Sequence, residues 1–318
     1  MTAVELEFAS WSPEHLDDAA HLLAARHKLH RQSNLALPEL DQDGARQLLL
    51  ETAAGTRGFV ACRAGELVGY LRYTPITEGH RAGFAWSDLN DHAATDAETT
   101  RSLYAHAAKH WVHAGLRQHV VHAPAVHDLL WPWFVTSFGI QHTWALRDTA
   151  PLHRHPSSDD IVMRRIGPDE AATAGLADLV LTEHLRGSPA FSPMPTPSVR
   201  EAVREQREFL EEPSVCALVA ELDGKHLGYG EITDDRKRDL RAPSGGAIFG
   251  IVVVAESARG QGVGRSLTSA LLDWAREQGF DHAICDWAAT NLESSRAFMS
   301  FGWTPTFYRL YRVLPEPV

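Results

Sequence analysis

An internal repeat is the feature of this sequence that most constrains its fold. Residues 58–73 (GFVACRAGELVGYLRY) and residues 214–232 (SVCALVAELDGKHLGYGEI) share one pattern: an apolar run, a turn around Gly65 or Gly224, and a second run containing Gly-Tyr. Two such runs joined by a short glycine turn are typical of a β-hairpin. The same hairpin at two distant places predicts two copies of one domain.

The repeat extends to a helix and the turn that follows it. Residues 101–115 (RSLYAHAAKHWVHAG) align with residues 265–279 (RSLTSALLDWAREQG), which lie 164 positions later. The chain of 318 residues also exceeds the roughly 100–200 residues of one ordinary domain. We therefore expect a domain at residues 1–150, a linker rich in Pro, His and Ser at 151–160, and a second domain at 161–318.

Composition argues against several classes of function. The net charge of −11, with histidines neutral, argues against a nucleic-acid partner, because phosphate backbones bind clustered Lys and Arg. No apolar run reaches the roughly 18 residues of a membrane span, and the amino terminus has no basic start, so we expect neither membrane insertion nor secretion. Cys62, Cys216 and Cys285 are an odd number of cysteines in apolar runs, which favours free thiols and a cytoplasmic location.

A glycine-rich loop in the second copy separates a strand-like run from a helix-like run. Residues 248–254 (IFGIVVV) have the β-branched composition of a buried strand. Glycines then alternate at Gly260, Gly262 and Gly264, before apolar residues recur at helical spacing. Without side chains on its inner wall, such a loop lets several backbone N–H groups converge on one anion, and the helix dipole adds positive charge. The loop therefore predicts a phosphate or pyrophosphate site.

Spacing separates the ligand classes that use such a loop. A Walker loop ends in Lys and then Ser or Thr, whereas Gly264 is followed by Arg265. A dinucleotide fingerprint begins directly after the strand, and residues 255–259 make that distance too long here. The remaining pattern is Arg/Gln-x-x-Gly-x-Gly/Ala, present at residues 259–264. It resembles the turn that binds the pyrophosphate of coenzyme A in the GNAT superfamily of acyl-CoA-dependent N-acyltransferases.

A second motif strengthens this resemblance. The family's N-x-x-A-x-x-L-Y-x-x-x-G-F segment is matched at Asn291, Ser294, Ala297, Phe298, Gly302 and Trp303. The resemblance implies an α/β (α+β) fold of two tandem GNAT domains, each with a mixed, mostly antiparallel, splayed sheet flanked by helices. It also implies acetyl-CoA as the cosubstrate. The residues expected to bind it are Val252, Val253, Val254, Arg259, Gly260, Gln261, Gly262, Val263, Gly264, Arg265, Asn291, Ser294 and Phe298.

The first copy departs from this motif at its loop. The alignment places Asp96 and Glu98 where Gly260 and Gly262 stand in the second copy. Two carboxylates facing a pyrophosphate would cost roughly a few kcal/mol in a partly buried site. We therefore expect only the second copy to bind coenzyme A, while the first completes a shared core, covers the second domain or shapes its acceptor cleft. Mycothiol synthase, a two-copy member with one degenerate copy, has a similar architecture.

The general base and acid are less clearly marked by the motifs. Acyl transfer to an amine needs a neutral amine, a stabilised oxyanion and a protonated leaving thiolate. The resemblance assigns the oxyanion to a backbone N–H of the splayed strand. The family's frequent tyrosine acid falls on Phe298, which has no proton to donate. Tyr308 and Tyr311 are candidate acids on sequence proximity alone, or the thiolate takes its proton from water. Glu231 is the first candidate for the base, ahead of Asp286, and a water chain to solvent is the alternative.

Two other groups of residues are interpreted as structural. His106 and His110 are spaced i, i+4 on an expected helix, which permits a metal-binding face. No HExxH motif, paired cysteine or carboxylate at matching spacing accompanies them, so we expect no metal site. The aromatic residues within 131–138 (WPWFVTSF) are interpreted as core or interface packing.

These features predict a cytoplasmic N-acetyltransferase, which moves an acetyl group from acetyl-CoA to a primary amine of a small molecule by direct attack. No recognisable Cys, His and acid constellation supports a covalent enzyme intermediate. The acidic charge favours a small-molecule acceptor over a protein tail. The alternative is a catalytically weak acyl-CoA-binding regulatory protein, for which Phe298 is the evidence. A nucleotide-binding oxidoreductase is a third hypothesis.

Overall fold

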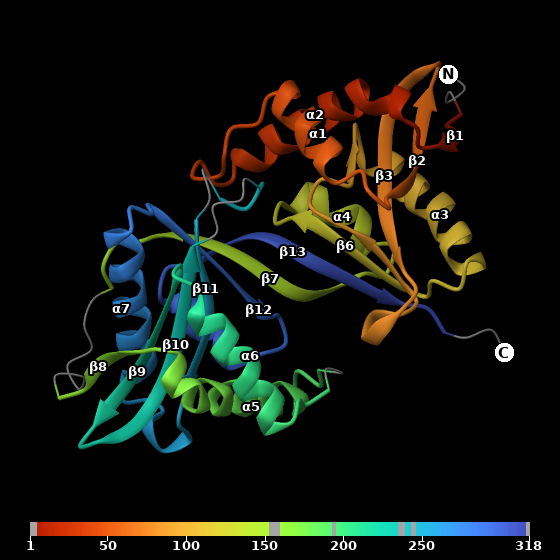
Figure 1. Cartoon of the computed structure of the whole chain (residues 1–318). Helices are drawn as coiled ribbons and strands as arrows, with labels where there is room; N and C mark the ends of the chain where they lie inside the picture. Colours follow the sequence, from red (N-terminus) through yellow and green to blue (C-terminus); the bar gives the residue numbers. More distant parts are fainter. Residues whose placement is uncertain (1–4, 153–159, 193–194, 235–238, 243–245, 316–318) are drawn as a thin grey trace. The chain divides into compact units, whose positions relative to one another are not determined.

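The computed structural model describes residues 5–152, 160–192, 195–234, 239–242 and 246–315. The chain forms two compact units that alternate along the sequence (Figure 1). Unit 1 contains residues 1–143, 239–243 and 305–318, and unit 2 contains residues 144–238 and 244–304. Most of the expected linker, residues 153–159, lies outside the described residues.

Unit 1 is a mixed, mostly antiparallel sheet with helices packed on it. Its strand order is β1-β2-β3-β4-β6-β13, and β5 pairs with β3. Only the β4–β6 pair among these is parallel. The elements are β1 (Glu7–Ser10), η1 (Pro13–His15), α1 (Leu16–Arg31), α2 (Gln42–Glu51), β2 (Arg57–Arg63), β3 (Glu66–Ile76), η2 (Gly79–Arg81), β4 (Phe84–Ser87), β5 (His92–Ala94), α3 (Ala97–His113), β6 (Gln118–Pro124), α4 (His127–Phe134), the start of β7 (Gly139–Asp148), and β13 (Thr304–Val313).

The core of unit 1 lies where α3 packs against β2 and β3. Phe59 and Ala61 of β2 belong to the same buried cluster as Leu103 and Trp111 of α3. Val60, between the two strand residues, is also fully buried. Because side chains alternate along a strand, Val60 faces the other side of the sheet, so both faces of β2 are covered.

Unit 2 repeats this arrangement with the order β8-β9-β10-β11-β12, and β7 lies beside β12. The β11–β12 pair is parallel, while β8–β9, β9–β10 and β10–β11 are antiparallel. Its elements are the end of β7, β8 (Val162–Ile166), η4 (Pro168–Glu170), α5 (Ala171–Arg186), α6 (Val199–Glu211), β9 (Val215–Leu222), β10 (Lys225–Asp234), β11 (Ala247–Val254), η5 (Glu256–Ala258), α7 (Val263–Glu277), β12 (His282–Ala288) and α8 (Leu292–Ser300).

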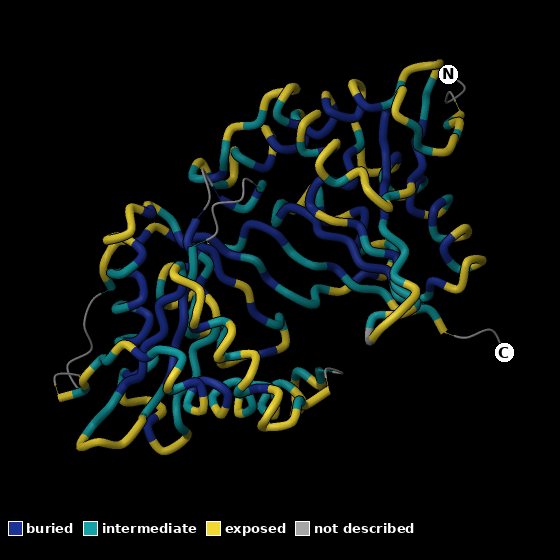
Figure 2. The backbone as a smooth tube through the Cα atoms, viewed as in Figure 1, coloured by how far each residue is buried: buried dark blue, intermediate teal, exposed yellow. Residues whose placement is uncertain are grey.

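Two buried clusters cover the two faces of the unit 2 sheet. One joins Phe249 of β11 to Leu267 and Leu271 of α7 and includes Trp303. The other joins strands β8, β9 and β10 to helices α5 and α6. Figure 2 shows the strands of each unit as largely buried and the outer turns of the helices as exposed. These observations confirm the expected fold class, a mixed sheet flanked by helices in each of two units.

The last strand does not stay with the unit that precedes it in the sequence. β13 pairs with β6 of unit 1 without interruption, from Phe307↔Pro124 to Val313↔Gln118, and residues 305–318 are grouped with unit 1. The sequence alone placed this strand in the second domain. Pairing with β13 supplies hydrogen-bond partners to β6, whose backbone groups would otherwise be open on that side.

The splay implied by the family resemblance is present in unit 2. The pairs between β11 and β12 end at Phe249↔Cys285, although β11 continues to Val254 and β12 to Ala288. On its other side β11 stays paired with β10 as far as Gly228↔Val254. The two parallel strands therefore diverge over their carboxyl-terminal halves, and one edge of β11 is left open there.

Candidate functional site

A cleft of about 500 Å³ opens in unit 2 beside this free edge of β11. Its walls come from α5, the end of β11, the loop after it, the first turns of α7, and α8. The lining residues are Val180, Leu181, His184, Val252, Val253, Val254, Ala258, Arg259, Gly260, Gly262, Val263, Gly264, Arg265, Thr268, Asn291, Glu293, Ser294, Ala297, Phe298 and Phe301.

The glycine loop and the first turn of α7 form one wall of this cleft. Gly260 and Gly262 have φ of 76° and 83°, a left-handed conformation that residues with a side chain adopt only at a cost. Gly262 is the N-cap of α7 and offers no side-chain cap to the first helical turn. The first N–H groups of a helix lack partners within it, so they need an external acceptor. The dipole of α7 makes an anion the favoured acceptor.

Two arginines add positive charge at the same place. Arg259 forms an exposed ion pair with Glu293, with 3.3 Å between nitrogen and oxygen. The Arg265 guanidinium lies 4.7 Å from the centre of the Phe301 ring. An exposed ion pair is worth little, so Arg259 can exchange Glu293 for a more highly charged partner. Together with the start of α7, these groups place positive charge on one wall of the cleft.

Asn291 and His184 shape the wall formed by α8 and α5. Asn291 is buried and accepts a hydrogen bond from the Ser294 N–H at 3.2 Å, which caps α8. Its Oδ1 also lies 3.5 Å from Nε2 of His184. Asn291 thus fixes the start of α8 at the cleft. No sequence motif pointed to His184, because only the packing of α5 brings it to the second motif.

Phe298 both lines the cleft and belongs to the aromatic packing beneath it. Its ring stacks on Trp287 at a centroid distance of 5.4 Å and contacts Phe249 and Trp303 edge to face. An aromatic residue is therefore required here for packing, with or without a hydroxyl group.

The predicted coenzyme A residues come together with one exception. All of them line the cleft except Gln261, whose side chain donates instead to the Ser257 carbonyl at 2.9 Å. Tyr308 lies on β13 and packs against the core of unit 1, where burial raises the pKa of its phenol. Tyr308 belongs to unit 1, and neither Tyr308 nor Glu231 is among the residues that line the cleft of unit 2.

Glu231 lies in a β-bulge beside the splayed strand. Gly230 pairs with Val252 and Ile232 pairs with Phe249, so Glu231 alone faces the two β11 residues between them. The Tyr229 hydroxyl donates to its carboxylate at 2.5 Å. An ideal Cβ built on Gly250 would lie 2.7 Å from Cγ of Glu231, which shows how closely the two strands approach.

The environment of Glu231 favours its neutral form near neutral pH. The residue is 7% exposed, and burial raises the pKa of its carboxyl to about 7, with a further rise from the charge of Asp178. Hydrogen bonds from Tyr229 and from the Ile251 N–H lower the same pKa. Burial and the Glu231 charge raise the pKa of Tyr229, which stays protonated. Glu231 is therefore poised to exchange a proton near pH 7.

Comparisons with known proteins agree with this site. Residues 181–303 match the model of the acetyltransferase (GNAT) family. Aminoglycoside N(6')-acetyltransferase type 1 of Serratia marcescens is 30% identical over 122 residues, which are 36% of this chain and 83% of that protein. The chain belongs to the GNAT acetyltransferase family.

Solved structures show the same fold across both units. The structure of a GCN5-related N-acetyltransferase from Sphaerobacter thermophilus aligns with this chain at a TM-score of 0.60 and 12% sequence identity. The alignment covers 98% of this chain and 97% of that protein. The structure of an acetyltransferase of the GNAT family from Colwellia psychrerythraea aligns at a TM-score of 0.51 and 15% sequence identity. The alignment covers 97% of this chain and 100% of that protein. At such identities the likeness concerns the fold alone.

Two absences concern the described residues only. No helix among them is long and apolar enough to cross a membrane. No group of three or more His, Cys, Asp or Glu side chains within the described ranges is arranged to hold a metal ion.

Proposed function

We propose that unit 2 transfers an acetyl group from acetyl-CoA to a primary amine of a small molecule by direct attack. The observation that carries this proposal is the uncapped start of α7, which faces the same cleft as the free edge of β11. A pyrophosphate would accept hydrogen bonds from the N–H groups of the first turn of α7, and Arg259 and Arg265 would neutralise its charge. The open backbone of residues 252–254 would hold the pantetheine arm.

When bound, acetyl-CoA supplies the acetyl thioester, and the side chains of this unit move protons and exclude water. We assign Glu231 as the base that takes a proton from the attacking amine, because its pKa of about 7 balances ionisation against basicity at neutral pH. A backbone N–H of β11 near Val254 stabilises the developing oxyanion. Phe298 offers no proton, so the leaving thiolate takes one from water.

The acceptor in this proposal is a small molecule with a primary amine. The Serratia marcescens relative is named for acetylation of an aminoglycoside, which places aminosugars in the panel to be tested, with amino acids and polyamines. A cytoplasmic location is part of the same proposal. Its support is that Cys62, Cys216 and Cys285 are all free thiols, as expected in a reducing compartment.

A catalytically weak acyl-CoA-binding regulatory protein is the second candidate. Phe298 favours it, because the cleft has no hydroxyl group at this position to protonate a thiolate. The two candidates share the binding site and differ only in turnover.

Gly262→Glu tests the proposed site directly. A carboxylate at the start of α7 repels a pyrophosphate, so we expect this variant to lose thermal stabilisation by acetyl-CoA, which for the unmodified protein is about 2.7 kcal/mol at 100 times Kd. Gly279→Glu is the matched control, because Gly279 also has a positive φ (86°), with open space around it. Undiminished stabilisation of Gly262→Glu by acetyl-CoA would show that the site lies elsewhere.

The amine panel separates the two candidates. For an acetyltransferase we expect release of coenzyme A with at least one amine and none with Gly262→Glu. Stabilisation by acetyl-CoA without turnover on any amine would favour the regulatory protein.

A further inference from the structure

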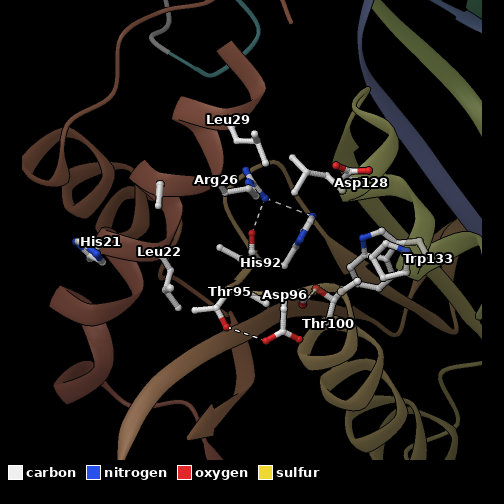
Figure 3. Close-up of a pocket in the computed structure, with 16 residues that line it drawn as sticks. His21, Leu22, Arg26, Leu29, His92, Thr95, Asp96, Thr100, Asp128 and Trp133 are labelled. Atoms are coloured by element: carbon white, nitrogen blue, oxygen red, sulfur yellow. Dashed lines mark hydrogen bonds between the residues drawn. The ribbon is translucent and has the colours of Figure 1, made fainter. Parts of the chain in front are cut away.

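Unit 1 contains a cavity of its own, of about 470 Å³. It is bounded by α1, β5, the start of α3 and α4 (Figure 3). These elements correspond in order to α5, β11, α7 and α8 around the cleft of unit 2. The degenerate copy has therefore kept a cavity at the position of the active-site cleft, with a different lining.

The start of α3 is closed to a pyrophosphate. Asp96 is the N-cap of this helix and accepts hydrogen bonds from the Thr99 N–H at 2.7 Å and the Thr99 hydroxyl at 2.9 Å. It also pairs with Arg63 at 3.4 Å. A fixed carboxylate thus satisfies the N–H groups and the dipole that a phosphate would use in unit 2.

A buried guanidinium without a carboxylate partner lines the same cavity. Arg26 is 5% exposed and donates to the backbone carbonyls of Leu89, at 2.6 Å, and His92. Its Nε has no hydrogen-bond partner among the described residues. The buried carboxylate of this unit, Asp91, is paired with Arg72 at 3.0 Å. Unit 1 therefore buries two guanidinium groups against one carboxylate in its described part.

A buried charge that contacts no carboxylate is costly because it has lost its hydration, and the charge of Asp91 offsets only part of this cost for Arg26. Burial accordingly lowers the pKa of Arg26. An anion that entered the cavity and paired with this guanidinium would offset the cost, and the charge-assisted hydrogen bond would be stronger than a neutral one.

Two buried aromatic side chains lie beside Arg26 in the lining of the same cavity. Trp133 is 1% exposed, lines the cavity, and its indole N–H has no acceptor among the residues described. Figure 3 shows Arg26 extending from α1 and Trp133 from α4, with His92 between them. The His92 ring is 5.2 Å from that of Trp133, and burial lowers its pKa to about 3, so it is neutral and adds no charge.

The rest of the lining is apolar, with acids near the opening. Leu22, Leu29, Ala93, Leu129 and Pro132 form most of the walls. Asp96 and the exposed Asp128 also line the cavity. The two acids repel a polyanion such as a pyrophosphate, so the one buried cation is left to pair with a single negative charge that reaches it.

We propose that the cavity of unit 1 binds a small monocarboxylic acid with an apolar body, whose carboxylate is held by the Arg26 guanidinium. The apolar body fills the space between α1 and α4. This site is separate from the proposed acetyl-CoA site of unit 2, and its occupation does not require acetyl transfer.

The test uses the full chain and three pairs of probes: benzoate and benzamide, phenylacetate and phenylacetamide, hexanoate and hexanamide. Each pair has nearly the same shape and differs in charge. We expect at least one carboxylate to bind by isothermal titration calorimetry, with the matching amide at least tenfold weaker. No binding by any carboxylate, or equal affinity for acid and amide, would overturn the proposal.

Variants place the bound molecule. Arg26→Met removes the charge and should weaken carboxylate binding by 10- to 100-fold. If Arg26→Met fails to fold, Leu29→Trp serves instead, because Leu29 is 41% exposed and a larger side chain there obstructs the cavity. Leu35→Trp is the control, since Leu35 is 72% exposed and lies outside the cavity. Equal binding by Leu29→Trp and Leu35→Trp would refute the location.

Acetyl-CoA provides the last arm of the test. In Gly262→Glu the unit 2 site is blocked, so we expect no binding of acetyl-CoA but unchanged binding of the carboxylate. Acetyl-CoA binding that persists in Gly262→Glu and disappears with Leu29→Trp would show that the cavity of unit 1 is a coenzyme A site, contrary to the proposal. If no carboxylate binds while Gly262→Glu still abolishes acetyl-CoA binding, the proposal for unit 1 is wrong and the proposed function of unit 2 stands.

Discussion

Burial and neighbouring groups act in opposite directions on the pKa of Glu231. Burial between β10 and β11 disfavours its charge, while the Tyr229 hydroxyl and the Ile251 N–H stabilise the ionised form. Burial is the largest influence, so the pKa rises to about 7. A carboxylate on an exposed strand would instead ionise near pH 4 and be a weak base.

The pH profile of acetyl transfer tests this assignment. In the proposed mechanism the ionised form of Glu231 takes the proton, so we expect kcat/KM to rise with pH through about 7. Glu231→Gln should lose this rise and lower kcat/KM by about 10²–10⁴-fold. Tyr229→Phe removes a hydrogen bond that lowers the pKa, so it should shift the rise to higher pH. A profile for Glu231→Gln that keeps the wild-type rise would assign the base to another group.

The same substitution has a stability consequence of definite sign. Because the folded-state pKa of Glu231 lies above the unfolded value, its contribution to stability is fully present below about pH 4.5 and is lost as pH rises through about 7. Relative to Glu231→Gln, the unmodified protein should therefore become less stable between pH 5 and pH 8, by on the order of 3 kcal/mol. Urea unfolding of both proteins at the two pH values measures the difference.

At the scale of elements, β11 and the helix that follows it carry most of the site. The strand is paired on one side throughout and on the other only as far as Phe249. α7 and α3 occupy equivalent positions in the two copies, yet Gly262 leaves α7 uncapped while Asp96 caps α3. The N-cap residue thus decides whether the start of the helix is free for an anion, although the sequence alignment sets Asp96 against Gly260 and not against Gly262.

Gly250→Ala tests the bulge on β11. The added Cβ would lie 2.7 Å from Cγ and 2.9 Å from Oε1 of Glu231, so the carboxylate or the strand must shift. We expect destabilisation of about 1–3 kcal/mol. We also expect kcat to fall, so that kcat/KM decreases by a larger factor than KM increases. Gly167→Ala is the control, because a Cβ at Gly167 meets open space. Unchanged kinetics for Gly250→Ala would show that the position of Glu231 does not matter for catalysis.

At the scale of the whole molecule, the two units respond differently to acid. The described part of unit 1 buries five histidines, His27, His30, His92, His119 and His122. Burial lowers the pKa of the first four to about 3 or 4 and also lowers that of His122. Their folded-state pKa values lie below the unfolded value of about 6.5. These histidines therefore do not lower the free energy of unfolding above pH 6.5, and they lower it progressively as the pH falls towards 4.

We therefore expect unit 1 to unfold in acid before unit 2. Near pH 5 the unfolded chain binds about four more protons than the folded unit, which corresponds to a loss of about 5 kcal/mol per pH unit. We test this by hydrogen exchange measured by mass spectrometry between pH 7 and pH 4. Elements α1 and β6 of unit 1 should lose protection at a higher pH than β9 and β10 of unit 2. Equal protection of both groups down to pH 4 would contradict the expectation.

The sequence by itself determined the features that depend on local backbone chemistry. The hairpin turns at Gly65 and Gly224, the glycines of the loop and the helix after it were all recognisable, because positive φ, chain reversal and helical periodicity are properties of short segments. The repeat of these segments then predicted two copies of one fold. The absence of glycines from the loop of the first copy pointed to the different start of α3.

The tertiary structure alone decided which distant segments meet. Nothing in the sequence of β13 shows that it pairs with β6, because strand pairing depends on which edge is open. Glu231 acquires its raised pKa only when the bulge buries it against β11, and His184 reaches Asn291 only when α5 packs beside α8. The cavity of unit 1 and the unpaired charge of Arg26 are likewise visible only after folding, because burial is a property of the whole unit and not of a segment.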